Sequence, residues 1–396
     1  MNKTTILLFA CFWVLTAHGQ QRERYEFRRN LPVYADSLLK DLTYPLAWGN
    51  STITDFAEWK QVARQKVFEC MLEAPPKIPE GEGLLTKTKL LAEEQRDGYR
   101  ALKIDIPLSR YYDVPAYVLI PDGEGPFPAI NLLHDHGAHL FIGKEKMIKP
   151  LACEDSIVIC DADKWVKSLY DGQFVGDYLA QHGYVVLSTD APMWGERGQE
   201  EGPLRDKYDM IAGNMMMYGI DLSAYMTYDD LSSTEFLASM PEVDKERIGC
   251  MGCSMGAYRA WMLAALSPHI KATAAICWMT TTDEQLSFKY KRTENGGFAN
   301  CLPGLRRWLD YPHIASLACP NAMLFINGNQ DKLFPVAGTE KAFHIMRDVW
   351  HSQGADEQLD TELWDMGHSC GLRAQERALQ FFEKHLKEHY TLNIKQ

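Results

Sequence analysis

Long apolar runs, internal repeats and low-complexity linkers are all missing from this chain of 396 residues. The apolar stretch near its start, Ile6–Ala17, is shorter than the roughly 20 residues that a membrane-spanning helix needs. Basic charge is also scarce, since 41 Lys and Arg stand against 53 Asp and Glu, and no basic stripe is present. These features argue against nucleic acid or a membrane as a partner and favour one folded unit.

The first residues have the three-part layout of a secretory signal. A short basic start ending at Lys3 precedes the apolar run Ile6–Ala17. Small residues stand at positions −3 and −1 of a cleavage site after Gly19. We expect residues 1–19 to be a signal peptide and the mature protein to be secreted or periplasmic. A lipoprotein signal ending at Cys11 is the alternative, and it would leave an unusually short apolar region.

Nine of the ten cysteines follow the signal, so at least one has no partner within a monomer. A disulfide such as Cys153–Cys160 stays open on sequence alone. Cys250 and Cys277 lie in apolar runs, where cysteine behaves as a small hydrophobic residue.

The pattern of elements divides the chain into two parts after the signal. Residues 20–83 read as a helical extension, in which Asp55 and Glu58 form a capping-box pattern. Residues 84–396 begin with strands that turn at Gly98-Tyr99, and from Leu133 onward strands and helices alternate. Such alternation predicts an α/β domain whose mainly parallel, twisted sheet is covered by helices on both faces.

A strand–turn–helix pattern surrounds Ser254. Apolar residues precede Gly252-Cys253-Ser254-Met255-Gly256, and the helix formers Ala257–Leu266 follow it. Gly-x-Ser-x-Gly in this context is a nucleophile elbow, which exposes the serine hydroxyl on a strained turn. We therefore expect Ser254 to be a nucleophile. Cys253 is its neighbour, but the elbow presents position 254, so thiol catalysis is not expected.

A nucleophilic serine needs a base and a group that orients the base. Asp331 follows the apolar run 321–326, and His368 follows the short strand 362–364. Both therefore occupy loops at the ends of strands, in the order acid then histidine that this elbow usually has. None of the other eleven histidines follows Asp331 at the end of an expected strand. We predict the triad Ser254, Asp331 and His368.

Two backbone N–H groups should stabilise the oxyanion that forms during acyl transfer. Met255 comes directly after the nucleophile, and the loop after strand 128–133 offers His136 or Gly137. That loop also has three histidines and Asp135 within six residues, which is a rival metal-site pattern. Its spacing differs from known zinc runs and no second carboxylate-rich loop stands out, so we expect neither metal nor cofactor.

Candidate pocket residues follow the strand 184–188. Trp194, Glu196 and Arg197 lie past its end, where an arginine could bind a substrate carboxylate. The alternative is that Glu196 and Arg197 brace their loop through each other or Asp190. The segment 279–318 is expected to form a cap or substrate wall. Trp194, Trp278 and Trp308 could stack on sugar rings or pack in the core.

The order of several motifs resembles that of one enzyme family over about residues 59–385. The shared motifs are Asp113–Pro121, His134-x-His136-Gly137, Gly183–Asp190, Trp194–Gly198, Met240–Ile248, Leu302–Leu305 with Asp310, and Ile314–Pro320 before Asn327-Gly328. Together they resemble the secreted α/β-hydrolases of the dienelactone-hydrolase-like or acetyl-xylan-esterase-like family.

This resemblance implies an α/β-hydrolase fold and a serine esterase with the triad named above. The chain departs from the family in two places. The founding dienelactone hydrolases use cysteine where this chain has Ser254, and the oxyanion loop usually has glycine where this chain has Asp135. The expected activity is removal of acetyl groups from plant-type polysaccharide or oligosaccharide. A glucuronoyl esterase, a serine peptidase and a non-catalytic glycan-binding protein remain alternatives.

Overall fold

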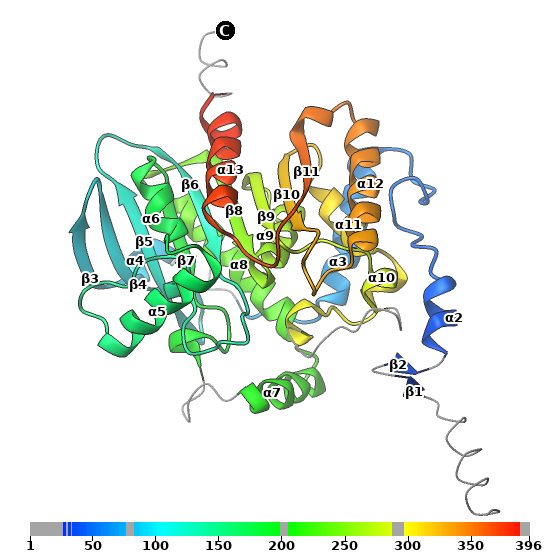
Figure 1. Cartoon of the computed structure of the whole chain (residues 1–396), viewed down its shortest axis with the longest axis horizontal. Helices are drawn as coiled ribbons and strands as arrows, with labels where there is room; N and C mark the ends of the chain where they lie inside the picture. The colour runs from blue at the N-terminus through cyan, green and yellow to red at the C-terminus, as the bar shows by residue number, and fades with distance from the viewer. Residues whose placement is uncertain are drawn as a thin grey trace, which may run out of the picture.

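The computed structural model describes residues 27–28, 31–32, 34–76, 83–198, 205–286 and 297–388. A nine-stranded sheet runs through the molecule in the order β11-β10-β9-β8-β6-β7-β5-β4-β3 (Figure 1). Its strands are β3 (Lys89–Arg96), β4 (Tyr99–Ser109), β5 (Tyr112–Pro121), β6 (Phe127–Leu133), β7 (Val185–Thr189), β8 (Val243–Cys253), β9 (Ile270–Ile276), β10 (Ala322–Gly328) and β11 (Leu359–Trp364). A separate antiparallel pair joins β1 (Phe27–Arg28) to β2 (Leu31–Pro32).

Helices surround this sheet and connect its strands. They are α2 (Ala35–Lys40), α3 (Phe56–Cys70), α4 (Leu84–Lys87), α5 (Ser156–Leu169), α6 (Val175–Gln181), α7 (Arg205–Met217), α8 (Leu222–Ser239), α9 (Met255–Leu266), α10 (Thr282–Leu286), α11 (Tyr311–Ala315), α12 (Val336–Ser352) and α13 (Leu372–Phe382). Short 3-10 turns include Lys144–Lys146, Gly195–Arg197 and Phe298–Asn300, and a π-helical turn, Glu383–Glu388, follows α13.

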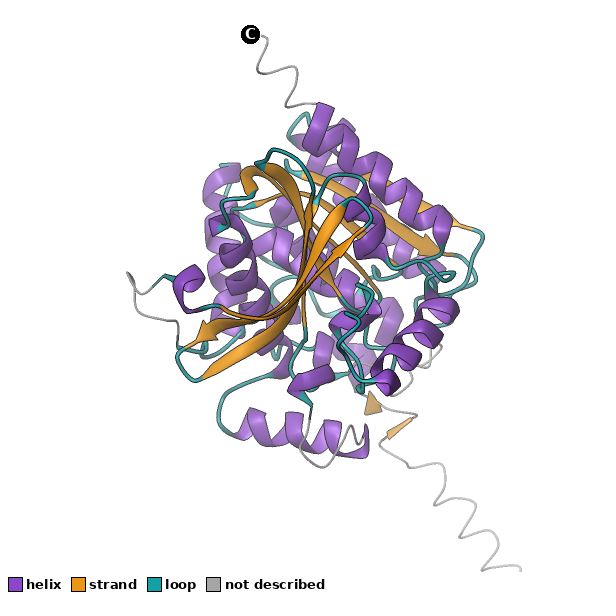
Figure 2. Cartoon of the chain, turned by 90° about the vertical axis from the view of Figure 1, so that its left-hand side faces the viewer, coloured by secondary structure: helices purple, strands orange, loops and turns teal. Residues whose placement is uncertain are grey.

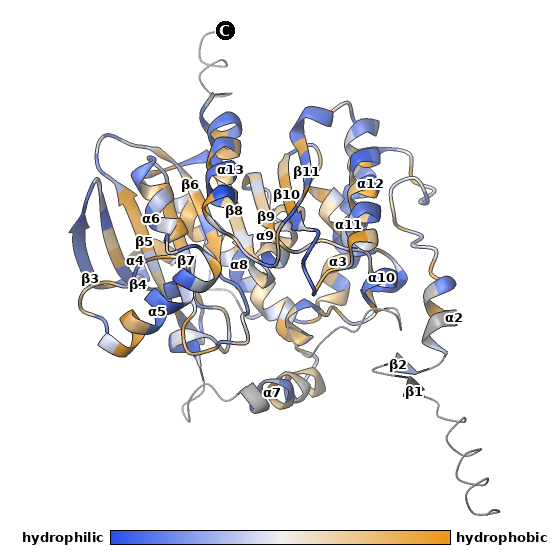
Figure 3. Ribbon diagram, viewed as in Figure 1, coloured by the Kyte–Doolittle hydropathy of each residue, from blue (hydrophilic) through white to orange (hydrophobic). Residues whose placement is uncertain are grey.

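The pairing of neighbouring strands changes once across the sheet, from antiparallel to parallel. The pairs from β3 to β7 are antiparallel, whereas every pair from β7 through β11 is parallel. The parallel strands β7 and β10 are buried along their whole length, as expected for strands covered on both faces. The edge strand β3 is largely hydrophilic and exposed, which protects the sheet edge from pairing with other chains (Figure 3). The mainly parallel, twisted sheet predicted from the sequence is thereby confirmed (Figure 2).

Two hydrophobic clusters fill the space between the sheet and its helices. On β10, Met323 and Phe325 belong to one cluster, and Leu324 and Ile326 belong to the other. Since neighbouring side chains of a strand point to opposite faces, the clusters lie on opposite sides of the sheet. The first cluster includes α3, α8, α9, α11 and α12, and the second includes α5, α6 and α13.

The expected helical extension contains α3, which begins as its sequence predicts. The Asp55 side chain accepts a hydrogen bond from the Glu58 N–H at 2.7 Å, and Trp59 is fully buried in the first cluster. The expected signal, residues 1–19, and Cys11 lie outside the described residues. Within the described ranges, no helix has the length and apolarity that crossing a bilayer would take. Cys153 and Cys160 are separate free thiols, so the structure does not contain the disulfide left open by the sequence.

Candidate active site

Ser254 occupies the tip of the turn between β8 and α9. Its backbone has φ 56° and ψ −123°, a strained conformation for a residue with a side chain. The Ser254 N–H donates to the Ile276 carbonyl at 2.8 Å and holds the turn. A Cβ on Gly252 would lie 2.2 Å from the Gly256 backbone, and one on Gly256 would lie 1.9 Å from the Leu133 carbonyl oxygen. Both glycines are therefore required for the elbow to close.

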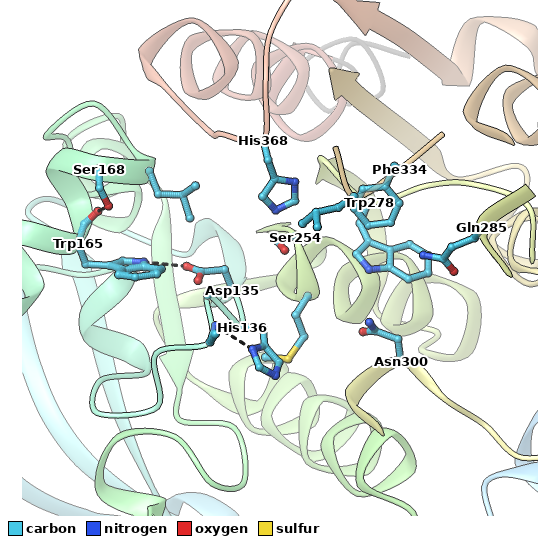
Figure 4. Close-up of a pocket in the computed structure, with 15 residues that line it drawn as sticks. Asp135, His136, Trp165, Ser168, Ser254, Trp278, Gln285, Asn300, Phe334 and His368 are labelled. Atoms are coloured by element: carbon cyan, nitrogen blue, oxygen red, sulfur yellow. Dashed lines mark hydrogen bonds between the residues drawn. The ribbon is translucent and has the colours of Figure 1, made fainter. Parts of the chain in front are cut away.

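His368 and Asp331 come from neighbouring loops, after β11 and β10. The His368 Nδ1 donates to Asp331 Oδ2 at 2.6 Å, and the Asp331 side chain is fully buried. Asp331 Oδ1 accepts from the Leu333 N–H at 2.8 Å, which fixes the carboxylate. Because Nδ1 carries the proton toward Asp331, Nε2 is the ring nitrogen left to act as a base. Figure 4 shows the Ser254 hydroxyl beneath the His368 ring, and both residues line one pocket.

The surroundings of His368 favour its charged form. Burial alone would lower its pKa, but the hydrogen bond and charge of Asp331, with the nearby Cys277 thiol, raise the pKa above the ordinary 6.5. Cys277 Sγ also contacts the Ser369 carbonyl at 3.4 Å. The site therefore stabilises the imidazolium that a general base becomes when it takes a proton.

The loop after β6 lies beside the elbow. His136, Gly137 and Ala138 line the pocket, and the backbone turns back at Gly137 with φ +59° and at Ala138 with φ 52°. The His136 carbonyl is used by the Lys146 ammonium at 3.1 Å. Neither the Gly137 N–H nor the Met255 N–H donates to another atom of the described chain. Both donors thus remain available at the pocket, next to Ser254.

Asp135, the departure from the family pattern, anchors this loop. Its Oδ2 accepts from Tyr170 at 2.8 Å and from the Trp165 indole at 3.1 Å, and Oδ1 lies 3.4 Å from the Lys146 ammonium. The side chain is fully buried. Nearby in the same loop, Gly137 has no room for a side chain, since a Cβ there would lie 2.2 Å from the Trp165 ring. The aspartate therefore ties the loop after β6 to α5.

The histidines of the same loop have separate structural partners. His134 Nδ1 bonds to the Asp135 carbonyl at 2.9 Å and Nε2 accepts from the Ala191 N–H at 3.0 Å. Burial lowers the pKa of His134 well below its ordinary value. His139 bonds to Asp161 at 2.5 Å. The ring nitrogens of His134 and the Nε2 of His139 are thus engaged by groups of the protein itself.

Two clusters of possible metal-ligating side chains occur in the described chain. In one, Glu145, Asp190 and Glu196 approach one another, but the Lys144 ammonium already lies between them at 2.6, 3.0 and 2.7 Å. In the other, Cys277 joins Asp331 and His368, whose facing atoms bond to each other. Neither arrangement leaves a set of free ligands for a metal.

Trp194, Glu196 and Arg197 are not among the residues that line the pocket. Trp194 is fully buried, and its indole donates to the His136 carbonyl at 3.2 Å. Glu196 pairs with Lys144, and Arg197 pairs with Asp229 at 2.7 Å. Arg197 also donates to the Asp190 carbonyl at 3.0 Å. These contacts agree with the alternative that the sequence left open, in which Glu196 and Arg197 brace the loop after β7.

The pocket has a volume of about 270 Å³ and two walls (Figure 4). One wall comes from α5 and the β6 loop, and the other comes from the ends of β9 and β10 and from the segment 279–318. The lining residues are Asp135, His136, Gly137, Ala138, Trp165, Ser168, Leu169, Ser254, Met255, Trp278, Gln285, Asn300, Leu333, Phe334 and His368. Gln285 and Asn300 on the second wall lie in the segment 279–318, which the sequence predicted as a cap or substrate wall without naming these residues. The sequence offered no local signal for Trp165 or Ser168, which α5 brings in from a distant part of the chain.

A strained serine at a strand–helix turn, at the carboxyl edge of a parallel sheet, beside a histidine paired with a buried aspartate, defines the α/β-hydrolase class. The family model that matches residues 24–357 is described as the Abhydrolase family, and the chain belongs to this family. The protein is a hydrolase, as the resemblance predicted, and the recognised fold is confirmed.

A curated relative is YtaP of Bacillus subtilis (strain 168), a protein named as a hydrolase. It is 28% identical over 325 residues, which cover 82% of this chain and 98% of YtaP. A Bacteroides fragilis protein named as an acetyl xylan esterase superposes with a TM-score of 0.66 at 19% identity, over 86% of this chain and 84% of that one. A glucuronoyl esterase from Solibacter usitatus superposes with a TM-score of 0.58 at 14% identity. The match covers 86% of this chain and 97% of that one. At these identities the two structures show a shared fold.

Proposed function

We propose that this protein is a serine carboxylic-ester hydrolase that removes acetyl groups from carbohydrate. One observation carries the proposal. Ser254, held in the elbow conformation, shares a pocket with His368, whose other ring nitrogen bonds to the buried Asp331 at 2.6 Å. This is the arrangement that an activated serine nucleophile requires.

In the first half of the reaction, His368 Nε2 takes the proton of Ser254 as Oγ bonds to the acyl carbon. The N–H of Met255 and an N–H of the 136–137 loop stabilise the tetrahedral oxyanion. His368 then gives its proton to the leaving alcohol, and the carbon–oxygen bond of the ester breaks. Asp331 keeps the proton on Nδ1 throughout and stabilises the imidazolium.

In the second half, a water molecule attacks the acyl group bound to Ser254. His368 accepts a proton from this water and later returns it to Ser254 Oγ, which leaves free carboxylic acid. No metal or cofactor takes part in this scheme. The raised pKa of His368 suits both steps, because the same ring must accept a proton and donate it again.

The acetylated-carbohydrate substrate is supported by the pocket and by the neighbours. Trp165 and Trp278 both line the pocket, and the Bacteroides fragilis neighbour is named as an acetyl xylan esterase. The signal-like residues 1–19 support export, where such a substrate would be met. Esters of uronic acid, peptides and binding without turnover are the competing outcomes.

The test is acetate release from acetylated xylan and acetylated xylo-oligosaccharides, with Ser254→Ala as the matched variant. We expect release by the wild-type protein and none by the variant. Hydrolysis of 4-nitrophenyl acetate without acetate release from xylan would keep the mechanism and contradict the substrate. Retained activity in Ser254→Ala would contradict the mechanism, and glycan binding without any turnover would favour the non-catalytic alternative.

A further inference from the structure

We propose that Gln285 and Asn300 determine specificity by bonding to hydroxyl groups on the alcohol part of the ester, a neutral sugar unit. The proposal rests on the esterase function above. Both residues belong to the wall formed by segment 279–318, Gln285 on α10 and Asn300 at the end of the 3-10 turn Phe298–Asn300. Figure 4 shows both amides on the same side of the pocket as Trp278, across from Trp165.

The two amides are buried with oxygen atoms that the protein does not use. Gln285 is 3% exposed and Asn300 is 5% exposed. Gln285 Oε1 and Asn300 Oδ1 are buried and accept no hydrogen bond from the described chain. An unsatisfied buried acceptor destabilises a folded protein, and native structures contain few of them. Because both residues line the pocket, a ligand that donates hydrogen bonds would satisfy these two acceptors.

The start of α10, which carries Gln285, is held by several contacts with neighbouring segments. The Asp310 carboxylate accepts from the Thr282 N–H at 3.1 Å and from its hydroxyl at 2.5 Å, and so caps the start of α10. The Thr281 N–H donates to the Gly338 carbonyl at 3.2 Å, and Asp283 pairs with Lys341 on α12. A preorganised acceptor pair discriminates better than one on a mobile loop, because less ordering accompanies binding.

The charge of the pocket selects a neutral donor. None of the lining residues in the described chain is Lys or Arg, and the single lining carboxylate, Asp135, is already bonded to Lys146, Trp165 and Tyr170. A uronate carboxylate would thus find no lysine or arginine among the described lining residues. Sugar hydroxyls donate hydrogen bonds to the amide oxygens.

The experiment compares two esters that share an acetyl group and a six-membered ring. Methyl 2-O-acetyl-β-xylopyranoside has hydroxyl groups next to the ester, and cyclohexyl acetate has none. The measured quantity is the ratio of kcat/KM for the sugar ester to kcat/KM for the cyclohexyl ester. We expect each of Gln285→Leu and Asn300→Leu to lower this ratio roughly tenfold, since a site built around a hydroxyl loses its preference when the partner is removed.

The matched control is Gln65→Leu on the exposed face of α3, far from the pocket, which should leave the ratio unchanged. Asn300→Asp keeps an acceptor in nearly the same shape and should retain more of the ratio than Asn300→Leu. It also serves as the test if the leucine variants melt at a lower temperature than the wild type.

The outcomes distinguish a failure of the proposed amide role from a failure of the proposed esterase function. An unchanged ratio in folded leucine variants, or a wild-type preference for cyclohexyl acetate, would overturn the role of the amides and leave the esterase intact. Hydrolysis of neither ester by the wild type, or equal hydrolysis by Ser254→Ala, would overturn the esterase and the amide role with it.

Discussion

His134 and His368 are both largely buried, and both follow a parallel strand at the same edge of the sheet. They differ in what holds their ring nitrogens. His134 bonds to a backbone carbonyl and a backbone N–H, so both nitrogens are occupied and burial keeps the ring neutral. His368 bonds on one side to the Asp331 carboxylate, which raises its pKa, and the other nitrogen is left for the pocket. For His368 a charged partner outweighs the effect of burial on the pKa, whereas for His134 burial prevails.

Removing the two histidines should separate chemistry from stability, and His368 gives the largest effect. We expect His368→Ala to lower kcat on an acetyl ester by about 10⁴-fold or more, since the serine loses its base. The measurement is initial rates on 4-nitrophenyl acetate with purified, folded protein. A variant that loses less than about tenfold would contradict the assignment of the base.

Changing the partner of His368 should have the next largest effect. Asp331→Asn keeps the shape of the side chain but allows the wrong ring nitrogen to carry the proton, so kcat should fall by about 10³- to 10⁴-fold. Rates and far-UV circular dichroism, measured on one preparation, distinguish this loss from unfolding. Near wild-type activity would show that Asp331 does not orient the ring.

A side chain at Gly137 should disturb the oxyanion loop without touching the triad. A Cβ there would lie 2.2 Å from the Trp165 ring and 2.7 Å from Asp135 Oδ1, so the loop must move. We expect Gly137→Ala to lower kcat by roughly 10- to 100-fold, a part of the loss that follows removal of one donor. Gly297→Ala is the control, because that glycine has open space around it. Equal effects of both substitutions would contradict the role of the loop.

The pH dependence should report the raised pKa of His368. The base must be neutral, so kcat/KM should fall as the pH drops through the pKa of this histidine, with a midpoint above 6.5. Removing the carboxylate in Asp331→Asn should move the midpoint of the remaining activity to lower pH. A wild-type midpoint clearly below 6.5 would mean that burial lowers the pKa of His368 by more than Asp331 raises it.

Substitution of His134 should have the smallest effect on catalysis and a clear effect on stability. His134→Ala leaves the Ala191 N–H and the Asp135 carbonyl without this partner, which should cost about 1 to 3 kcal/mol of unfolding free energy. Urea denaturation of the wild type and the variant measures this difference. A loss of activity in folded protein as large as that of His368→Ala would remove the distinction between the two histidines.

The elbow and the loops after β10 and β11 could be predicted because their signals are local. Gly252 and Gly256 belong to the Gly-x-Ser-x-Gly pattern around Ser254, and Asp331 and His368 each follow an apolar strand. The alternation of strands and helices likewise predicted the sheet. The sequence signal for each of these features lies within a few residues of its position.

The individual residues that line the pocket could not be predicted, because the contacts that place them are distant in the chain. The ammonium of Lys144 holds Glu196, which lies 52 residues away, and this partner removes Glu196 from the pocket. Trp165 reaches the site by bonding to Asp135 across 30 residues. No spacing rule in the sequence announces either contact, so the identity of the lining residues had to come from the structure.

The most direct test of the central claim is to trap the nucleophile. Diethyl 4-nitrophenyl phosphate should transfer its diethylphosphoryl group to Ser254 Oγ and release 4-nitrophenolate, and peptide mass spectrometry then locates the adduct. The account predicts one adduct per chain on Ser254, complete loss of esterase activity as it forms, no adduct in Ser254→Ala and very slow formation in His368→Ala. An adduct on another residue that accompanies the loss of activity, or full activity in labelled protein, would contradict it.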